Sequence, residues 1–106
     1  MGKAFPIITL AERGSVLIYD DNEFQIPAYK TEAIDPTGAG DVYGGSFIVE
    51  YLRTHDYVES ALFASAASSL MVEQVGPGFN LDLVEVRRRK ESIRTALVKT
   101  STDHRR

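Results

Sequence analysis

The sequence contains no cysteine and no tryptophan, and only four of its 106 residues are proline. The lack of cysteine excludes disulfides and thiolate metal sites, and it leaves the redox compartment undetermined. No apolar run approaches the roughly 18 residues of a membrane-spanning helix, and residues 1–6 lack the apolar core of a secretory signal. We therefore expect a soluble, cytoplasmic protein without a membrane partner.

The chain also has no excess of positive charge. The chain has 12 basic and 15 acidic residues and a net charge of −3, whereas proteins that bind nucleic acid usually carry a basic face. The basic residues cluster at Arg87-Arg88-Arg89-Lys90 and again at Arg105-Arg106, and we interpret the first cluster as the solvated face of a helix. We expect no nucleic-acid partner, and a single partial domain over residues 1–106 with flexible ends at 1–6 and 99–106.

The first third of the chain has the pattern of strands. Residues 7–10 and 15–19 are short apolar or β-rich runs, and the turn between them contains Gly14, which can take a positive φ. Asp20-Asp21-Asn22 is a second turn signal, after which residues 23–29 alternate apolar and polar side chains. These patterns predict three short strands, the last two as a hairpin.

The rest of the chain has helical periodicity. Helices are predicted over about residues 40–54, 58–74 and 83–98, with a break at His55-Asp56 and a polar tail from Thr100. One face of the second helix carries only small side chains. Three short strands form a smaller sheet than three helices need to pack against. The chain is therefore predicted to be a piece of a layered α/β protein. The apolar pattern of the first helix consists of Tyr43, Phe47 and Tyr51, flanked by Ile48 and Leu52, and one face of the second carries Val58, Leu62, Phe63, Ala66 and Leu70. The residues of the third helix predicted to point inward are Leu83, Val86, Ile93 and Leu97.

A glycine-containing loop, Asp35-Pro36-Thr37-Gly38-Ala39-Gly40-Asp41, opens the first predicted helix. Free N–H groups and the helix dipole at such a position favour a phosphate oxygen, although many similar loops are only tight turns. The loop is not a P-loop, because no Gly-Lys-Ser/Thr run follows. A dinucleotide fingerprint is disfavoured, because the preceding segment is polar rather than a buried strand.

The acidic residue at the end of this loop has two readings. A carboxylate beside an anion-binding loop suits a base that takes the proton from a hydroxyl attacking the held phosphate. Alternatively, Asp41 only caps the helix or favours its dipole. The residues alone leave both readings open.

The segment from Asp35 to Asp41, continued by Val42-Tyr43-Gly44-Gly45-Ser46-Phe47-Ile48, closely resembles the second signature of the ribokinase-like (pfkB-type) kinases. The resemblance implies the C-terminal part of a three-layer α/β/α fold. It also implies that Gly38, Ala39 and Gly40 form an anion hole and that Asp41 activates the acceptor hydroxyl. Two residues depart from the family pattern: Pro36 replaces a common threonine, and Ser46 stands where glycine or alanine is usual.

The flanking segments are similar to the family's nucleotide-contacting elements. Residues 8–15 resemble its strand-turn, matching at Thr9 and Gly14, although Ala11 stands where glycine is frequent. Ser65 matches the wall beside the adenine pocket. The resemblance implies ATP and Mg²⁺ as cofactors, and in some members a monovalent cation near the residues matching Asp35 and Gly76. The nucleotide-binding residues expected on this basis are Thr9, Gly14, Thr37, Gly38, Gly40 and Ser65.

The family's acceptor site and its magnesium-linked Asn-x-x-Glu motif lie in an earlier portion of a longer chain. No Asn-x-x-Glu occurs here, so no metal ligand is assigned. The leading hypothesis is an ATP-dependent phosphotransferase to an alcohol of a sugar or nucleoside-like molecule, with this chain alone expected to be inactive. The alternatives are a non-catalytic nucleotide-binding fragment that needs a partner segment or a second copy, and a purely structural fragment.

Overall fold

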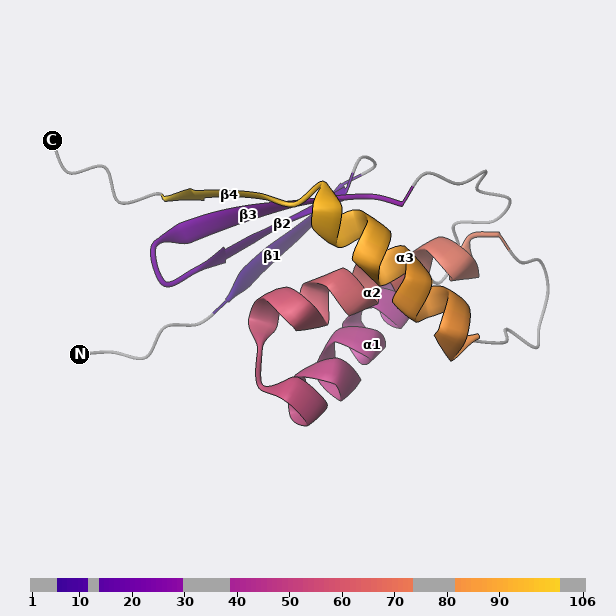
Figure 1. The fold of residues 1–106 in the computed structure, drawn as a ribbon. Helices are drawn as coiled ribbons and strands as arrows, with labels where there is room; N and C mark the ends of the chain where they lie inside the picture. The colour runs from indigo at the N-terminus through magenta and orange to yellow at the C-terminus, as the bar shows by residue number, and fades with distance from the viewer. Residues whose placement is uncertain (1–5, 12–13, 30–38, 74–81, 102–106) are drawn as a thin grey trace, which may run out of the picture.

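The computed structural model describes residues 6–11, 14–29, 39–73 and 82–101. Among these residues, no helix is long and apolar enough to cross a membrane. Figure 1 shows the helices gathered on one face of a four-stranded sheet. The elements in chain order are β1 (Ile7–Ala11), β2 (Gly14–Tyr19), β3 (Asn22–Pro27), α1 (Ala39–Thr54), α2 (Tyr57–Met71), α3 (Leu83–Thr95) and β4 (Val98–Ser101).

The sheet is an antiparallel meander in the order β1-β2-β3-β4. Asp20 and Asp21 join β2 to β3 in two residues, and both have positive φ, 55° and 62°. A two-residue hairpin requires this conformation, and aspartate tolerates it better than most residues. The pair Tyr19 and Asn22 closes the turn, which sets the register of β2 on β3.

Gly14 is required where β2 begins. Its φ is +141°, and a Cβ at this position would lie 2.2 Å from the carbonyl oxygen of Ile26. No side chain fits there without moving the β3 backbone. The close approach of the two strands at this end of the hairpin therefore depends on glycine.

The core lies between the sheet and α2. Leu17 of β2 and Ile26 of β3 are 0% and 1% exposed and pack in one cluster with α2 and α3. α2 contacts α1, α3 and the sheet, so it is buried around almost its whole circumference. This packing explains why the sequence predicts a helix face of small side chains: Ala61, Ala64 and Ala67 let neighbouring elements approach α2 closely on more than one side.

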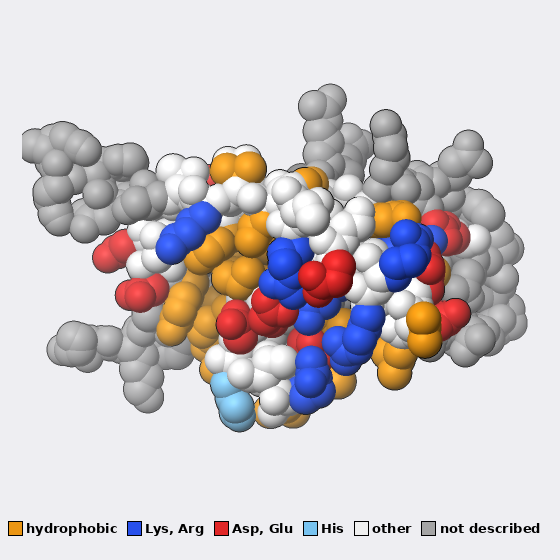
Figure 2. Space-filling view, in the orientation of Figure 1, with side chains coloured by type: hydrophobic (Ala, Val, Ile, Leu, Met, Phe, Trp, Pro, Cys, Tyr) orange, Lys and Arg blue, Asp and Glu red, His pale blue; other side chains and the backbone are white. Residues whose placement is uncertain are grey.

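A cluster of charges joins the three helices. Glu50 of α1 is 1% exposed, and its Oε2 lies 3.2 Å from Nζ of Lys90 on α3. The same ammonium lies 2.9 Å from Oε1 of Glu59 on α2. Arg53 and Arg94 pair with the two carboxylates, and these hydrogen bonds lower the pKa of both Glu50 and Glu59 to about 2. Figure 2 shows acidic and basic side chains interleaved on one face of the molecule.

The sequence predictions for the third helix need correction. The helix ends at Thr95 rather than continuing to Val98, and Val98–Ser101 forms β4, which pairs with the free edge of β3. Residues 99–101 of the expected flexible end belong to this strand. Local periodicity could not indicate the strand, because its partner lies more than seventy residues earlier in the chain.

Two further predictions about α3 are wrong in part. Leu83 is 52% exposed, because it is the first helical residue and lies beyond the packed turns. Arg89 and Lys90 are buried rather than solvated, since both are paired with glutamates of neighbouring elements, whereas Arg87 and Arg88 are exposed. Gly76-Pro77-Gly78, the glycine- and proline-containing segment that follows the second predicted helix, lies outside the described residues.

Replacing Gly14 should destabilise the chain. Gly14→Ala is expected to lower the free energy of unfolding by more than about 1 kcal/mol, since it combines an unfavourable φ with a steric clash against Ile26. Gly45→Ala is the matched control: it lies inside α1 with nothing near its Cβ, and should stabilise by about 0.5–1 kcal/mol. Urea unfolding of both variants checks this, and equal effects would contradict it.

Neutralising a buried carboxylate should lower the free energy of unfolding far more than neutralising an exposed one. Glu50→Gln is expected to lower the unfolding free energy by about 3 kcal/mol, because Lys90 then loses a charged partner inside the protein. Glu91→Gln, whose side chain is 64% exposed beside Arg94, should change it by less than about 0.5 kcal/mol. Urea unfolding of both variants measures this difference. A small change in the unfolding free energy of Glu50→Gln would show that the charge cluster does not stabilise the fold.

Candidate active site at the start of α1

The first turn of α1 is formed by Ala39, Gly40 and Asp41. Gly40 and Asp41 are exposed, and nothing lies within 4 Å of a Cβ built on Gly40. The N–H groups of a first turn have no intrahelical partner, so they can donate to a ligand. Positive dipole charge at the same end favours an anion. Thr37 and Gly38, the other predicted loop residues, lie outside the described residues.

Asp41 differs from the other helix-initiating aspartates. Asp56 and Asp82 accept hydrogen bonds from two backbone N–H groups each, as N-caps of α2 and α3. Asp41 lies inside the helix, and none of the hydrogen bonds or ion pairs of the described residues involves its carboxylate. The capping reading of Asp41 therefore finds no support, and the carboxylate remains available to a ligand.

The surface of α1 next to Asp41 is bare. Residues three and four positions further along share its helix face, and both are glycine, Gly44 and Gly45, with open space at each Cβ. A molecule can thus approach the Asp41 carboxylate closely from this side. The next turns expose Ile48 and Leu52, which are 59% and 68% accessible. Among the described residues, the Asp41 face of α1 is consequently open and largely apolar.

Two side-chain hydrogen bonds fix the start of α1 in the fold. Ser68 of α2 donates to the carbonyl oxygen of Ala39 at 3.2 Å. Tyr43 and Ser15 of β2 share a buried hydrogen bond of 3.0 Å between their hydroxyl oxygens. Ser65, predicted to contact nucleotide, is buried and lies one turn before Ser68 on the same face of α2. The structure therefore brings Ser65 to the side of α2 that faces α1.

The structure separates Thr9 from this group. Side chains alternate along a strand, and Thr9 pairs with Val16, whose neighbours Ser15 and Leu17 face the helices. Thr9 is accordingly exposed on the opposite face of the sheet. Gly14 lies at the end of the hairpin, next to Ser15, and so borders both faces.

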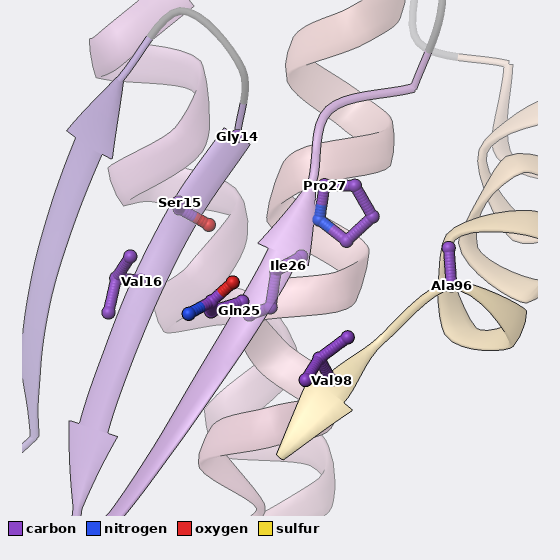
Figure 3. A pocket seen from close by; sticks show the side chains of 8 residues that line it. All are labelled: Gly14, Ser15, Val16, Gln25, Ile26, Pro27, Ala96 and Val98. Atoms are coloured by element: carbon purple, nitrogen blue, oxygen red, sulfur yellow. The ribbon is translucent and has the colours of Figure 1, made fainter. Parts of the chain in front are cut away.

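A pocket of about 330 Å³ lies on that opposite face. Figure 3 shows it in front of the strands, with the helices behind them, between the hairpin and the segment joining α3 to β4. Gly14, Val16 and Gln25 line one side, and Ala96 and Val98 line the other. Of the described residues that line the pocket, Gly14 alone belongs to the predicted nucleotide-binding set, and none of them carries a charge.

The described residues give no support for a metal site of their own. They contain no group of three or more histidine, cysteine or acidic side chains that could hold an ion. Asp41 alone would give a metal one carboxylate. No step of the chemistry is therefore assigned to a metal held by these residues.

The sequence analysis missed the hydrogen bonds by which Ser15, Tyr43 and Ser68 support the site. Their partners lie 28 or 29 residues away, so no local pattern marks them. Burial of Tyr43, which is 7% exposed, raises the pKa of its hydroxyl, so the proton stays in place at neutral pH.

Comparison with known proteins adds independent evidence. The profile described as pfkB family carbohydrate kinase matches residues 1–83. A nucleoside kinase of Methanothermobacter thermautotrophicus is 42% identical over 81 residues, which cover 76% of this chain and 26% of that protein. An inositol 3-kinase of Arabidopsis thaliana is 33% identical over 91 residues, covering 80% and 26%. The chain thus spans about a quarter of the length of the curated relatives it matches.

The fold has solved counterparts of the same kind. The crystal structure of a Methanocaldococcus jannaschii nucleoside kinase, described as an archaeal member of the ribokinase family, superposes with a TM-score of 0.72 at 34% identity. The superposition covers 82% of this chain and 30% of that one. The expected partial ribokinase-like α/β fold is therefore confirmed.

The contrast between Asp41 and a true cap can be measured. Asp56→Ala should lower the unfolding free energy by about 1–2 kcal/mol, because two backbone N–H groups lose their acceptor. Asp41→Ala should cost less than about 1 kcal/mol, since only the interaction with the helix dipole is lost. Thermal and urea unfolding of the two variants compare them, and a larger loss at Asp41 would restore its structural reading.

Proposed function

The chain belongs to the pfkB family of carbohydrate kinases, and on that premise we propose that it forms the nucleotide-binding and catalytic-base part of an ATP-dependent kinase. The acceptor is an alcohol group of a sugar or a nucleoside-like molecule. One observation carries the proposal: the unpaired, exposed carboxylate of Asp41 stands beside the free N–H groups of a helix start.

The proposed chemistry uses positioning and charge. The main-chain N–H groups of Ala39 and Gly40, together with Gly38 outside the described residues, hold the oxygens of the transferring phosphoryl group. Bound ATP supplies that group. An Asp41 carboxylate oxygen accepts the proton of the acceptor hydroxyl, whose oxygen attacks the γ-phosphorus. The bond from that phosphorus to the bridging oxygen of the β-phosphate breaks, and ADP leaves with the electron pair. The bare surface at Gly44 and Gly45 gives the acceptor room to approach Asp41.

The nucleotide would extend from this helix start toward the hairpin. We assign its other contacts to Thr37, Gly14 and Ser65, and assign none to Thr9, which lies on the opposite face of the sheet. Mg²⁺ accompanies the nucleotide in this proposal, with ligands from outside the described residues. The proposal also includes a monovalent cation near Asp35 and Gly76, two residues that lie outside the described ranges. It places the protein in the cytoplasm.

The acceptor is proposed by analogy with the relatives. Nucleoside kinases are 42% and 38% identical to this chain, and a Staphylococcus aureus ribokinase is 35% identical. A nucleoside and ribose are therefore the first two acceptors to compare.

A second candidate function is a nucleotide-binding fragment without catalysis. The exposed apolar side chains of Ile48, Val49 and Leu52 favour it, because this face of α1 lacks a covering partner among the described residues. A partner segment or a second copy of the chain would cover the face and supply the acceptor site.

The first test is a calorimetric titration of the chain with Mg·ATP. Saturation near one equivalent is expected, and Asp41→Asn should bind with an affinity within about threefold of the wild type, since the main-chain donors remain. A folded chain that produces no binding heat would contradict nucleotide binding by the chain alone.

The catalytic role needs a complete enzyme. We would replace the matching 81-residue segment of the Methanothermobacter nucleoside kinase with that of this chain and assay turnover with nucleoside and Mg·ATP. Asp41→Asn in the chimera should lower kcat at least about 100-fold, the usual contribution of a general base. Asp56→Asn, which keeps a capping side chain, is the matched control and should leave kcat within about twofold. Retained turnover in the Asp41→Asn chimera would remove Asp41 from the role of base.

A further inference from the structure

The hydrogen bond between Ser15 and Tyr43 connects the two elements on which the proposed nucleotide site depends. Ser15 follows Gly14 at the end of the hairpin, and Tyr43 lies two residues after Asp41. The two hydroxyl oxygens are 3.0 Å apart, and the residues are 5% and 7% exposed. This polar bond therefore lies inside the protein, between β2 and the first turns of α1.

The geometry of a helix gives this bond a consequence at Asp41. Successive residues are about 100° apart around the axis, so side chains two positions apart point in nearly opposite directions. With Tyr43 held inward against Ser15, Asp41 must point outward, and it is exposed. The bond thus limits rotation of the first turn about the helix axis.

A second contact restrains the same turn along another direction. Ser68 of α2 donates to the carbonyl oxygen of Ala39. That carbonyl also lies four residues before Tyr43, so it is the normal acceptor of the Tyr43 N–H. The first turn is therefore held by α2 on one side and by the hairpin on the other.

We propose that Tyr43 and Ser15 are positioning residues, which hold the Asp41 turn at a fixed orientation to the Gly14 end of the hairpin. This inference rests on the proposed function, because it assigns the two hydroxyls to the same nucleotide site. Neither hydroxyl contacts the reacting atoms; both act through Asp41 and the N–H groups beside it. A phenylalanine at position 43 would fill the same space, so the hydroxyl is needed only for orientation.

The test compares Tyr43→Phe, Ser15→Ala and the double variant with wild type. Amide hydrogen exchange at Tyr43 and Gly44, whose N–H groups donate to the first-turn carbonyl oxygens of Ala39 and Gly40, should accelerate roughly three- to tenfold, the factor for losing one intramolecular hydrogen bond. The double variant should exchange no faster than either single one. Amides of α3 should be unchanged, which separates a local change from general destabilisation.

Tyr57→Phe is the matched control. It also removes one tyrosine hydroxyl, but that hydroxyl belongs to the first residue of α2. There Tyr57 stacks on Tyr51, near the C-terminal end of α1 and away from Asp41. The exchange of Tyr43 and Gly44 should stay within about twofold of wild type. Unchanged exchange at these amides in Tyr43→Phe, or additive effects of the two single substitutions, would overturn the proposal.

Titration of the same variants with Mg·ATP tests whether the orientation of the Asp41 turn affects nucleotide affinity. Affinity should fall roughly three- to tenfold in Tyr43→Phe and Ser15→Ala and stay constant in Tyr57→Phe. Faster exchange with unchanged affinity would overturn the proposal, because the bond would then anchor the helix without affecting the site. If wild type does not bind Mg·ATP, nucleotide binding by the chain alone fails, and the exchange comparison still decides whether the two hydroxyls orient the turn.

Discussion

The structure depends on a single ammonium group held between carboxylates of two other helices. Lys90 of α3 contacts Glu50 of α1 and Glu59 of α2, and both Lys90 and Glu50 are almost fully buried. Burying the charges of Lys90 and Glu50 is costly unless each finds a partner, so packing of the helices must bring the partners together. The cluster therefore favours the arrangement of α3 in which Lys90 meets both carboxylates.

The arrangement of the helices in turn determines where the candidate site lies. α2 contacts the sheet as well as α1 and α3, and small side chains let all of them approach. α1 is fixed by Glu50 near its end and by contacts from Ser68 and Ser15 near its start. Asp41 is therefore presented outward on a rigid element, which suits a group that must act on a bound molecule. The face of α1 beyond it remains open and apolar.

Much of the fold could be predicted because its signals are local. The strands before residue 28, the three helices and the Asp20-Asp21 turn follow from periodicity and turn chemistry over a few residues. β4 could not be predicted, because four residues become a strand only when the edge of β3 is available. The cluster at residues 87–90 was misjudged for a similar reason. Charge alone indicates solvent, and only the packed helices provide the glutamates that allow Arg89 and Lys90 to be buried.

The sequence by itself determined the family signature, the position of the glycine loop and the choice of Asp41 as the candidate base, since these depend on residues adjacent in the chain. Tertiary structure alone decided that the Asp41 carboxylate is not a cap, that Thr9 faces away from the helices and that Tyr43 meets Ser15. The physical reason is distance along the chain. Hydrogen bonds and ion pairs act over a few ångströms, so contacts between residues 28 or more positions apart exist only after the elements have packed.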